Sequence, residues 1–106
     1  MVDRREHGRK EVSIEMRLLV RGETPTIIPC RVVDISQSGA KVRIDVRYRL
    51  PRNVFLVRNE NENIYECETA WQIEQTAGLT FVGPCARGKH QDLLREIAIA
   101  EPVGRT

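Results

Sequence analysis

The sequence predicts a mainly β protein: a six-stranded antiparallel β-barrel followed by a short C-terminal α-helix. Three observations predict this fold class. Apolar residues recur at every second position over most of the chain, short polar turns separate the apolar runs, and the period changes only near the C-terminus. A chain of 106 residues has room for one hydrophobic core. Closing six strands into a barrel also removes the exposed edges of an open sheet.

The first three expected strands alternate clearly between apolar and polar residues. Every second residue over 12–20 is apolar, and the segment 21–26, which contains Gly and Pro, ends this strand. A second apolar run covers 28–32, and the polar segment 34–39 ends in Gly and predicts a tight turn. The third strand, 40–47, has the most regular alternation. We expect four of its side chains to face the core: Ala40, Val42, Ile44 and Val46.

The next three strands follow a break in the pattern. Pro51 lies in the segment 48–53, which ends the third strand. The fifth strand places Trp71 on the same face as Cys67, so we expect Trp71 to lie in the core. The expected elements are the fourth strand 54–58, the loop 59–63, the fifth strand 65–74, the turn 75–78 and the sixth strand 79–82.

Near the C-terminus the apolar period becomes that of a helix. The apolar residues Leu93, Leu94, Ile97 and Ala98 form the stripe of a short amphipathic helix that begins near Gly88. Pro102 ends it. We expect a single domain over residues 1–106, with an N-terminal arm at 1–11, the barrel at about 12–83 and the helix at about 88–100.

The positive charge of the chain is concentrated at its N-terminus. The formal net charge is +2, and residues 1–10 alone hold four basic and two acidic side chains (4 − 2 = +2). Of the 17 basic residues, fourteen are Arg, whose planar guanidinium matches phosphates and guanine edges. So small an excess excludes a protein that coats nucleic acid through many phosphate contacts. It favours a local anion site.

Several other classes of protein are also excluded. No apolar run approaches the roughly 20 residues that span a bilayer, and the N-terminus lacks the apolar stretch of a signal peptide. We therefore expect a cytoplasmic protein without membrane insertion. One Trp, two Tyr and two Phe are too few stacking platforms for a nucleic-acid-binding barrel.

The cysteines and histidines do not predict a metal or catalytic site. Cys30, Cys67 and Cys85 stand 37 and 18 residues apart with no C-x-x-C pair, and His7 and His90 are distant from them. We expect reduced, buried thiols and no metal. No nucleophile with a base and no convincing carboxylate pair is present, so we expect no catalytic residues and no enzyme.

Two short motifs stand out. An R-R-x-x-x-R pattern precedes the first strand, and a D-x-S-x-x-G turn follows the second. Their defining residues are Arg4, Arg5, Arg9, Asp34, Ser36 and Gly39. Each motif is common alone, but together, in this strand context, they resemble the PilZ domain, the bacterial receptor module for cyclic di-GMP. Ala70-Trp71 and Gly78-Leu79-x-Phe81 resemble the family's closing pattern, and the resemblance covers about residues 4–98.

The resemblance implies that these six motif residues bind cyclic di-GMP, with no other cofactor, and that the arm wraps over the barrel when the ligand binds. It also implies a receptor that signals to a partner protein of the flagellar, pilus or polysaccharide machinery and so controls motility, biofilm or polysaccharide output. Gly8 stands where the family often has Pro or a bulkier residue, which loosens the arm. Arg4 favours a stacked dimer of the ligand over a monomer.

The residue types suit such a ligand. A guanidinium such as that of Arg5 or Arg9 can grip guanine O6 and N7 through two hydrogen bonds, or clamp a phosphate. Asp34 can accept hydrogen bonds from the guanine N1 and N2 donors, and Ser36 adds a hydroxyl. Gly39 would let the backbone turn without a Cβ that obstructs the ligand.

Two alternatives stay open. The chain could be a PilZ-type adaptor that binds proteins and no nucleotide. The second concerns the basic residues of the third strand and of the segment after it. They could form a solvated face, a wall of the ligand pocket or a docking surface for an acidic partner. These basic residues are Lys41, Arg43, Arg47, Arg49 and Arg52. The acidic residues of the fifth strand, Glu66, Glu68 and Glu74, can pair with them across the sheet.

Overall fold

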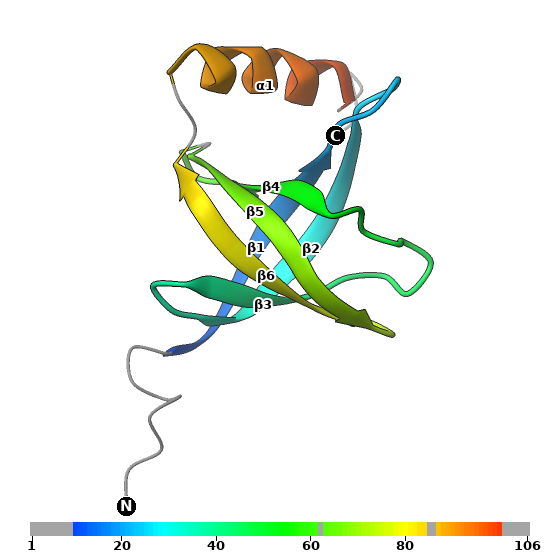
Figure 1. Cartoon of the computed structure of the whole chain (residues 1–106), viewed down its shortest axis with the longest axis vertical. Coiled ribbons are helices and arrows are strands. Elements are labelled where there is room, and N and C mark those ends of the chain that lie inside the picture. The colour runs from blue at the N-terminus through cyan, green and yellow to red at the C-terminus, as the bar shows by residue number, and fades with distance from the viewer. Residues whose placement is uncertain (1–9, 62, 85–86, 101–106) are drawn as a thin grey trace, which may run out of the picture.

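Six antiparallel strands close into a barrel, and one helix lies over an end of it (Figure 1). The structure, a computed structural model, describes residues 10–61, 63–84 and 87–100. Neighbouring strands follow the order β1-β2-β3-β6-β5-β4, and β4 pairs with β1 to close the barrel. The predicted fold class is confirmed. The elements are β1 (Lys10–Val20), β2 (Thr26–Ile35), β3 (Gly39–Arg43), β4 (Asn53–Arg58), β5 (Ile64–Ile73), β6 (Thr76–Pro84) and α1 (Arg87–Ala100).

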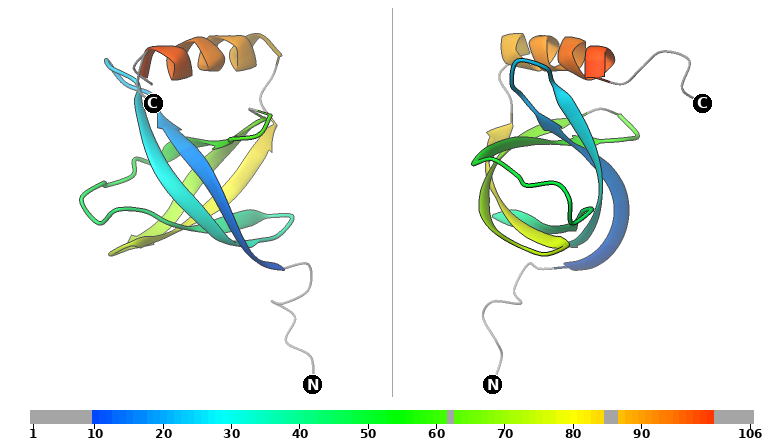
Figure 2. Two further views of the ribbon diagram at one scale, coloured as in Figure 1. Left: turned by 180° about the vertical axis from the view of Figure 1, so that it is seen from behind. Right: turned by 90° about the vertical axis from the view of Figure 1, so that its right-hand side faces the viewer.

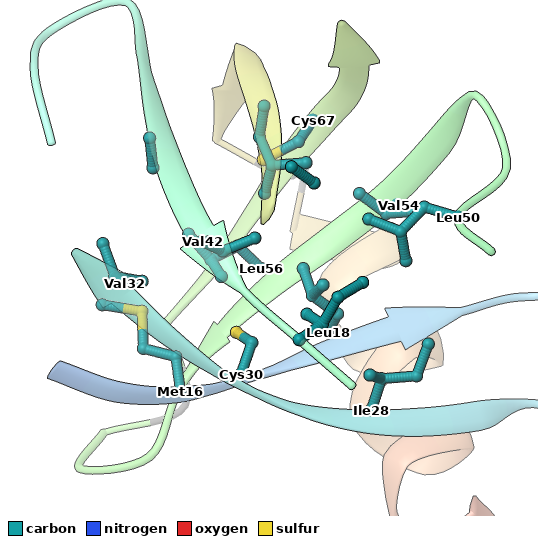
Figure 3. Packing of buried hydrophobic residues seen from close by; sticks show 14 residues of the cluster. Met16, Leu18, Ile28, Cys30, Val32, Val42, Leu50, Val54, Leu56 and Cys67 are labelled. Atoms are coloured by element: carbon teal, nitrogen blue, oxygen red, sulfur yellow. The ribbon is translucent and has the colours of Figure 1, made fainter. Parts of the chain in front are cut away.

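One cluster of buried apolar side chains fills the barrel interior (Figure 3). Every strand contributes to it, because alternate residues of each strand point inward. Cys30 and Cys67 are buried thiols without a disulfide bond, as expected, and Cys85 lies outside the described residues. Burial, and then the nearby Cys67, raise the pKa of Cys30 to about 12, so this thiol stays protonated. The buried members are Met16, Leu18, Ile28, Cys30, Val32, Ala40, Val42, Ile44, Leu50, Val54, Leu56, Cys67, Ala77 and Leu79.

The helix α1 covers a second apolar cluster, on the outside of the barrel. Leu93 and Ile97 of the predicted stripe are buried in it. Leu19 alternates with inward-facing residues of β1 and so points outward, yet it is fully buried because the helix covers it. The buried members of this cluster are Leu19, Phe55, Val57, Ile64, Leu93 and Ile97.

Ion pairs near both ends of α1 connect the helix to the barrel. Near its C-terminal end, the Arg21 guanidinium after β1 donates to the Glu96 carboxylate at 2.6 Å, and this hydrogen bond raises the pKa of Arg21. Near its N-terminal end, Lys89 binds Glu66 of β5 at 3.3 Å.

The expectation that Ala98 belongs to the buried stripe is wrong, because Ala98 is exposed. No helix within the described residues has the length and apolar content that a membrane span needs.

The third strand is shorter than the alternation predicts, and the expectation that Val46 faces the core is wrong. β3 ends three residues before Val46, whose side chain is 61% exposed. Asp45 turns the chain there: its Oδ1 accepts from the Arg47 N–H at 2.9 Å, and its carbonyl oxygen accepts from the Tyr48 N–H at 3.1 Å. The hydrogen bond from Arg47 lowers the pKa of Asp45. Such a bond from side chain to backbone competes with the strand ladder.

The acidic residues of β5 do not pair with the basic residues of β3 itself, because β6 lies between the two strands. Glu66 instead pairs with Lys89 of α1. Glu68 does pair with Arg52, in the segment before β4, at 3.8 Å, which confirms this one of the predicted pairings. Exposed pairs of this kind contribute little to stability.

We expect Leu93→Ala to lower the free energy of unfolding by about 3 kcal/mol, because it leaves a cavity beneath α1 and a 14-residue helix is marginal without its packing. Urea unfolding followed by circular dichroism measures this. The matched control is Ile99→Ala in the same helix, whose side chain is 68% exposed. That variant should lie within about 0.5 kcal/mol of the wild type. Equal losses in the two variants would contradict the packing of α1 described above.

Candidate functional site

The D-x-S-x-x-G segment spans the turn between β2 and β3, but the turn itself is shorter than predicted, because Asp34 still belongs to β2 and Gly39 already belongs to β3. The Ser36 N–H donates to the carbonyl oxygen of Gly39 at 2.9 Å, and Ser36 Oγ accepts from the Ser38 N–H at 3.2 Å. The Phe81 N–H of β6 donates to the carbonyl oxygen of Ser38 at 2.8 Å. The turn is therefore held both by its own side chain and by a neighbouring strand.

Gly39 permits two strands to approach closely. It pairs with Thr80 of β6, and a Cβ at Gly39 would overlap the carbonyl oxygen of Leu79 and lie 3.3 Å from the Thr80 Cα. The sequence suggested that this glycine leaves room for a ligand. The room it leaves is for the backbone of β6, a reason that a sequence motif cannot reveal. Contact between Gly39 and a ligand stays a prediction.

A β-bulge turns Asp34 to the outside of the barrel. Val32 pairs with Val42, but the next pair across β2 and β3 is Asp34 with Lys41, so Val33 is an extra residue. Val32 is fully buried, and strict alternation would have aimed Asp34 inward as well. The extra residue places Asp34 on the outer face, beside the outward-facing Lys41. Bulges are common next to functional sites because they re-aim a side chain.

A second β-bulge turns Trp71 outward, so the expectation that Trp71 lies in the core is wrong. Thr69 pairs with Leu79, but the next pair across β5 and β6 is Trp71 with Gly78, which leaves Ala70 as the extra residue. The Trp71 side chain is 41% exposed. A run of alternating residues carries no mark of the bulge that reverses its face.

Gln72 occupies the inward position that Trp71 leaves. Its Oε1 accepts from the Leu50 N–H at 2.9 Å, and its Nε2 donates to the carbonyl oxygen of Tyr48 at 2.7 Å. These two partly buried hydrogen bonds satisfy backbone groups of the irregular segment between β3 and β4. The bulge therefore serves two purposes, because it releases the indole to the surface and supplies an amide that anchors a loop.

The two bulges bring Asp34 and Trp71 into one row of paired residues, which crosses four neighbouring strands on the outer face of the barrel. Asp34 of β2 pairs with Lys41 of β3, Lys41 pairs with Gly78 of β6, and Gly78 pairs with Trp71 of β5. The indole lies against Gly78, because a Cβ there would overlap its Nε1 and Cε2 atoms. We call Asp34, Lys41, Gly78 and Trp71 the ligand row.

The ligand row forms part of a surface cavity of about 430 Å³, a size typical of small-molecule sites. Its wall offers a carboxylate, an ammonium group, hydroxyl groups and an aromatic ring, which together suit a ligand that is both polar and planar. The cavity lies among β2, β3, β5 and β6. The lining residues are Asp34, Ile35, Ser36, Ser38, Gly39, Ala40, Lys41, Ala70, Trp71, Gly78, Leu79 and Thr80.

The arginine motif lies outside the described residues, so the structure does not place Arg4, Arg5 or Arg9. The start of β1 is nevertheless described. Lys10 pairs with Ile35 and Glu11 pairs with Asp34. The residues that follow the motif directly therefore lie beside the D-x-S-x-x-G turn.

The structure divides the predicted basic face. Lys41 lines the cavity of the ligand row, whereas Arg43, two residues further along β3, lines a different cavity. Arg47 pairs with Asp45 in the turn after β3. Within the part of the chain that the structure describes, no three His, Cys, Asp or Glu side chains gather as metal ligands would.

Comparison with known families agrees with the fold and the motifs. The family described as the PilZ domain matches residues 3–98, which is nearly the whole chain. No curated protein matches the sequence.

We expect Gly78→Ala to displace the indole of Trp71, because the added Cβ would occupy the position of Nε1 and Cε2. Trp71 is the single tryptophan of the chain, so its fluorescence reports this directly. The emission should shift to the red as the ring moves into water, and about 1–3 kcal/mol of stability should be lost.

The matched control for this experiment is Gly88→Ala in α1, where an added Cβ meets nothing within 4 Å. Its emission spectrum should equal that of the wild type. An unchanged spectrum in the Gly78→Ala variant would contradict the placement of the indole on Gly78.

Proposed function

Because the chain belongs to the PilZ domain family, whose members are receptor modules for the bacterial second messenger cyclic di-GMP, we propose that it binds cyclic di-GMP across the ligand row. The observation that carries this proposal is the pair of β-bulges in β2 and β5. They turn a carboxylate and an indole out onto the same row of one cavity.

Asp34 would recognise the edge of a guanine base. A carboxylate accepts hydrogen bonds, and the Watson–Crick edge of guanine presents adjacent N1–H and N2–H donors. Adenine lacks this pair of donors, so Asp34 would reject it. The nearby Ser36 hydroxyl already accepts from the Ser38 N–H and can still donate to a ligand oxygen.

Trp71 would supply a surface for stacking. Its indole is partly exposed and lies against Gly78, which has no side chain to lift the ring off the sheet. Stacking of a nucleobase on an aromatic side chain contributes about 1–3 kcal/mol. Trp71 would thus be a binding residue, although the sequence pattern had assigned it to the core.

The N-terminal arm would complete the site with Arg4, Arg5 and Arg9. Arg5 stands five residues before Lys10, so it can reach about 18 Å from the start of β1, far enough to extend over the cavity. Its guanidinium would bind the guanine O6 and N7 atoms or a phosphate. Ordering the arm on binding carries an entropic cost, which lowers the affinity. Gly8 would increase this cost because glycine loses more backbone freedom than other residues.

The output would be a changed surface on this receptor. When the arm lies over the ligand row, it would cover β3 and β6 and present a new face to a partner protein. We propose a partner in the flagellar, pilus or polysaccharide machinery of the cytoplasm, with effects on motility, biofilm or polysaccharide output. PilZ domains are binding modules, and the proposal needs no catalytic residue.

Titration with cyclic di-GMP, followed by calorimetry and by Trp71 fluorescence, tests the proposed site. We expect binding below tens of micromolar. The double variant Arg5→Ala with Arg9→Ala and the variant Asp34→Ala should each weaken it by about tenfold or more, since hydrogen bonds to charged groups contribute about 1.5–3 kcal/mol. Cyclic di-AMP should bind far more weakly.

Asp92→Ala, which removes an exposed carboxylate of α1, is the matched control and should bind as the wild type does. If the folded wild type gives neither heat nor a fluorescence change, the receptor function is wrong. The adaptor that binds no nucleotide is then the better description.

Limited trypsin digestion tests the movement of the arm. The bonds after Arg4, Arg5 and Arg9 should be cut more slowly at saturating ligand, because the ordered arm fits a protease less well. Mass spectrometry of the N-terminal peptides measures the rates. Cleavage after Arg95 of α1, whose side chain is 71% exposed, serves as the internal control and should not change. Equal rates at the arm with and without ligand would contradict the ordering of the arm.

A further inference from the structure

Lys41 differs from Arg43, the other basic residue of β3. It stands at the centre of the ligand row, paired with Asp34 on one side and with Gly78 on the other. Its side chain is half-buried and lines the cavity. Within residues 10–61, 63–84 and 87–100, no hydrogen bond or ion pair engages its ammonium group, although the Asp34 carboxylate belongs to the neighbouring strand.

The lining of the cavity makes this ammonium group distinctive. Among the lining residues, Lys41 carries the single cationic side chain and Asp34 the single anionic one. A half-buried cation without a partner gains little from the protein itself. It is placed to meet a negative group that arrives with a ligand.

We propose that Lys41 is a phosphate-binding residue of the barrel wall and confers selectivity for the charged backbone of the ligand. This inference rests on the proposed function. A dinucleotide that offers a guanine edge to Asp34 and a base face to Trp71 must cross Lys41, because the strand order places Lys41 between them. The phosphodiester groups join the two nucleosides, so they are the part of the ligand that reaches this lysine.

The chemistry of the two cation sources explains why both are present. The arm would bring guanidinium groups only after it orders, whereas Lys41 is held on a strand before any ligand arrives. An ammonium group is a compact charge with three rotatable donors, and it can bind a phosphate oxygen from several directions. Lys41 would therefore present its charge to a phosphate oxygen from a fixed position on the barrel wall.

The test compares Lys41→Gln with Arg43→Gln in titrations with cyclic di-GMP. Both variants remove one positive charge from the same strand and the same face, but Arg43 lies in a different cavity. We expect Lys41→Gln to weaken binding about tenfold, in line with the loss of one charge-assisted hydrogen bond. Arg43→Gln should remain within about twofold of the wild type, because exposed charges are screened by salt.

Two further measurements separate a direct contact from a general loss of charge. Lys41→Arg should restore most of the affinity because it keeps the charge. The affinity of the wild type should also fall more steeply between low and high salt than that of Lys41→Gln. The urea midpoint of Lys41→Gln should equal that of the wild type, since the ammonium group has no partner among the described residues.

The outcomes distinguish the inference from the function on which it rests. If the wild type binds and Asp34→Ala does not, while Lys41→Gln binds as the wild type does, the role of Lys41 is wrong and the receptor function stands. Equal losses in Lys41→Gln and Arg43→Gln would also overturn it, because they indicate a general electrostatic effect. No binding by the wild type overturns the proposed function and this inference together.

Discussion

The closed hydrogen-bonded barrel is the constraint on which the rest of the structure depends. Because every strand pairs on both sides, the pairing register decides which side chains face inward and which face outward. The interior is full, so a polar side chain cannot turn inward without loss of packing. A residue that must reach the surface from an inward position therefore needs an extra residue in its strand. Val33 and Ala70 are these extra residues, and they turn Asp34 and Trp71 outward.

Close approach of backbones is the second requirement of the site. Gly39 allows β3 to lie against the carbonyl oxygen of Leu79, and Gly78 allows the indole of Trp71 to lie on the sheet. Neither glycine is explained by turn geometry, since neither has a positive φ. Both matter because a methyl group at either position would occupy space already filled. The glycine of the D-x-S-x-x-G motif thus has a packing role at the same place where its family suggests a ligand.

The molecule separates its structural support from its candidate site. The helix α1 lies at the end of the barrel away from β3 in the views of Figure 2, and it covers apolar side chains of β1, β4 and β5. The ligand row lies on β2, β3, β6 and β5, and the residues that line its cavity include none from α1. The first residues of β1, Lys10 and Glu11, pair with Ile35 and Asp34. An arm that closes over the row would therefore change one face of the barrel and leave the packing of the helix undisturbed.

The sequence by itself determined the six strands, the helix, the barrel and the two motifs, because period-two alternation and local turn chemistry are properties of neighbouring residues. It placed a turn between the second and third strands, although β2 continues through Asp34 to Ile35 before the turn begins. Only the tertiary structure decided that Trp71 leaves the core, that Val46 belongs to a turn, that Leu19 is covered by a helix and that Lys41 alone of its basic face enters the cavity. The physical reason is that strand register, bulges and the burial of an outer face depend on pairing between distant segments. A pattern along one strand does not contain that information.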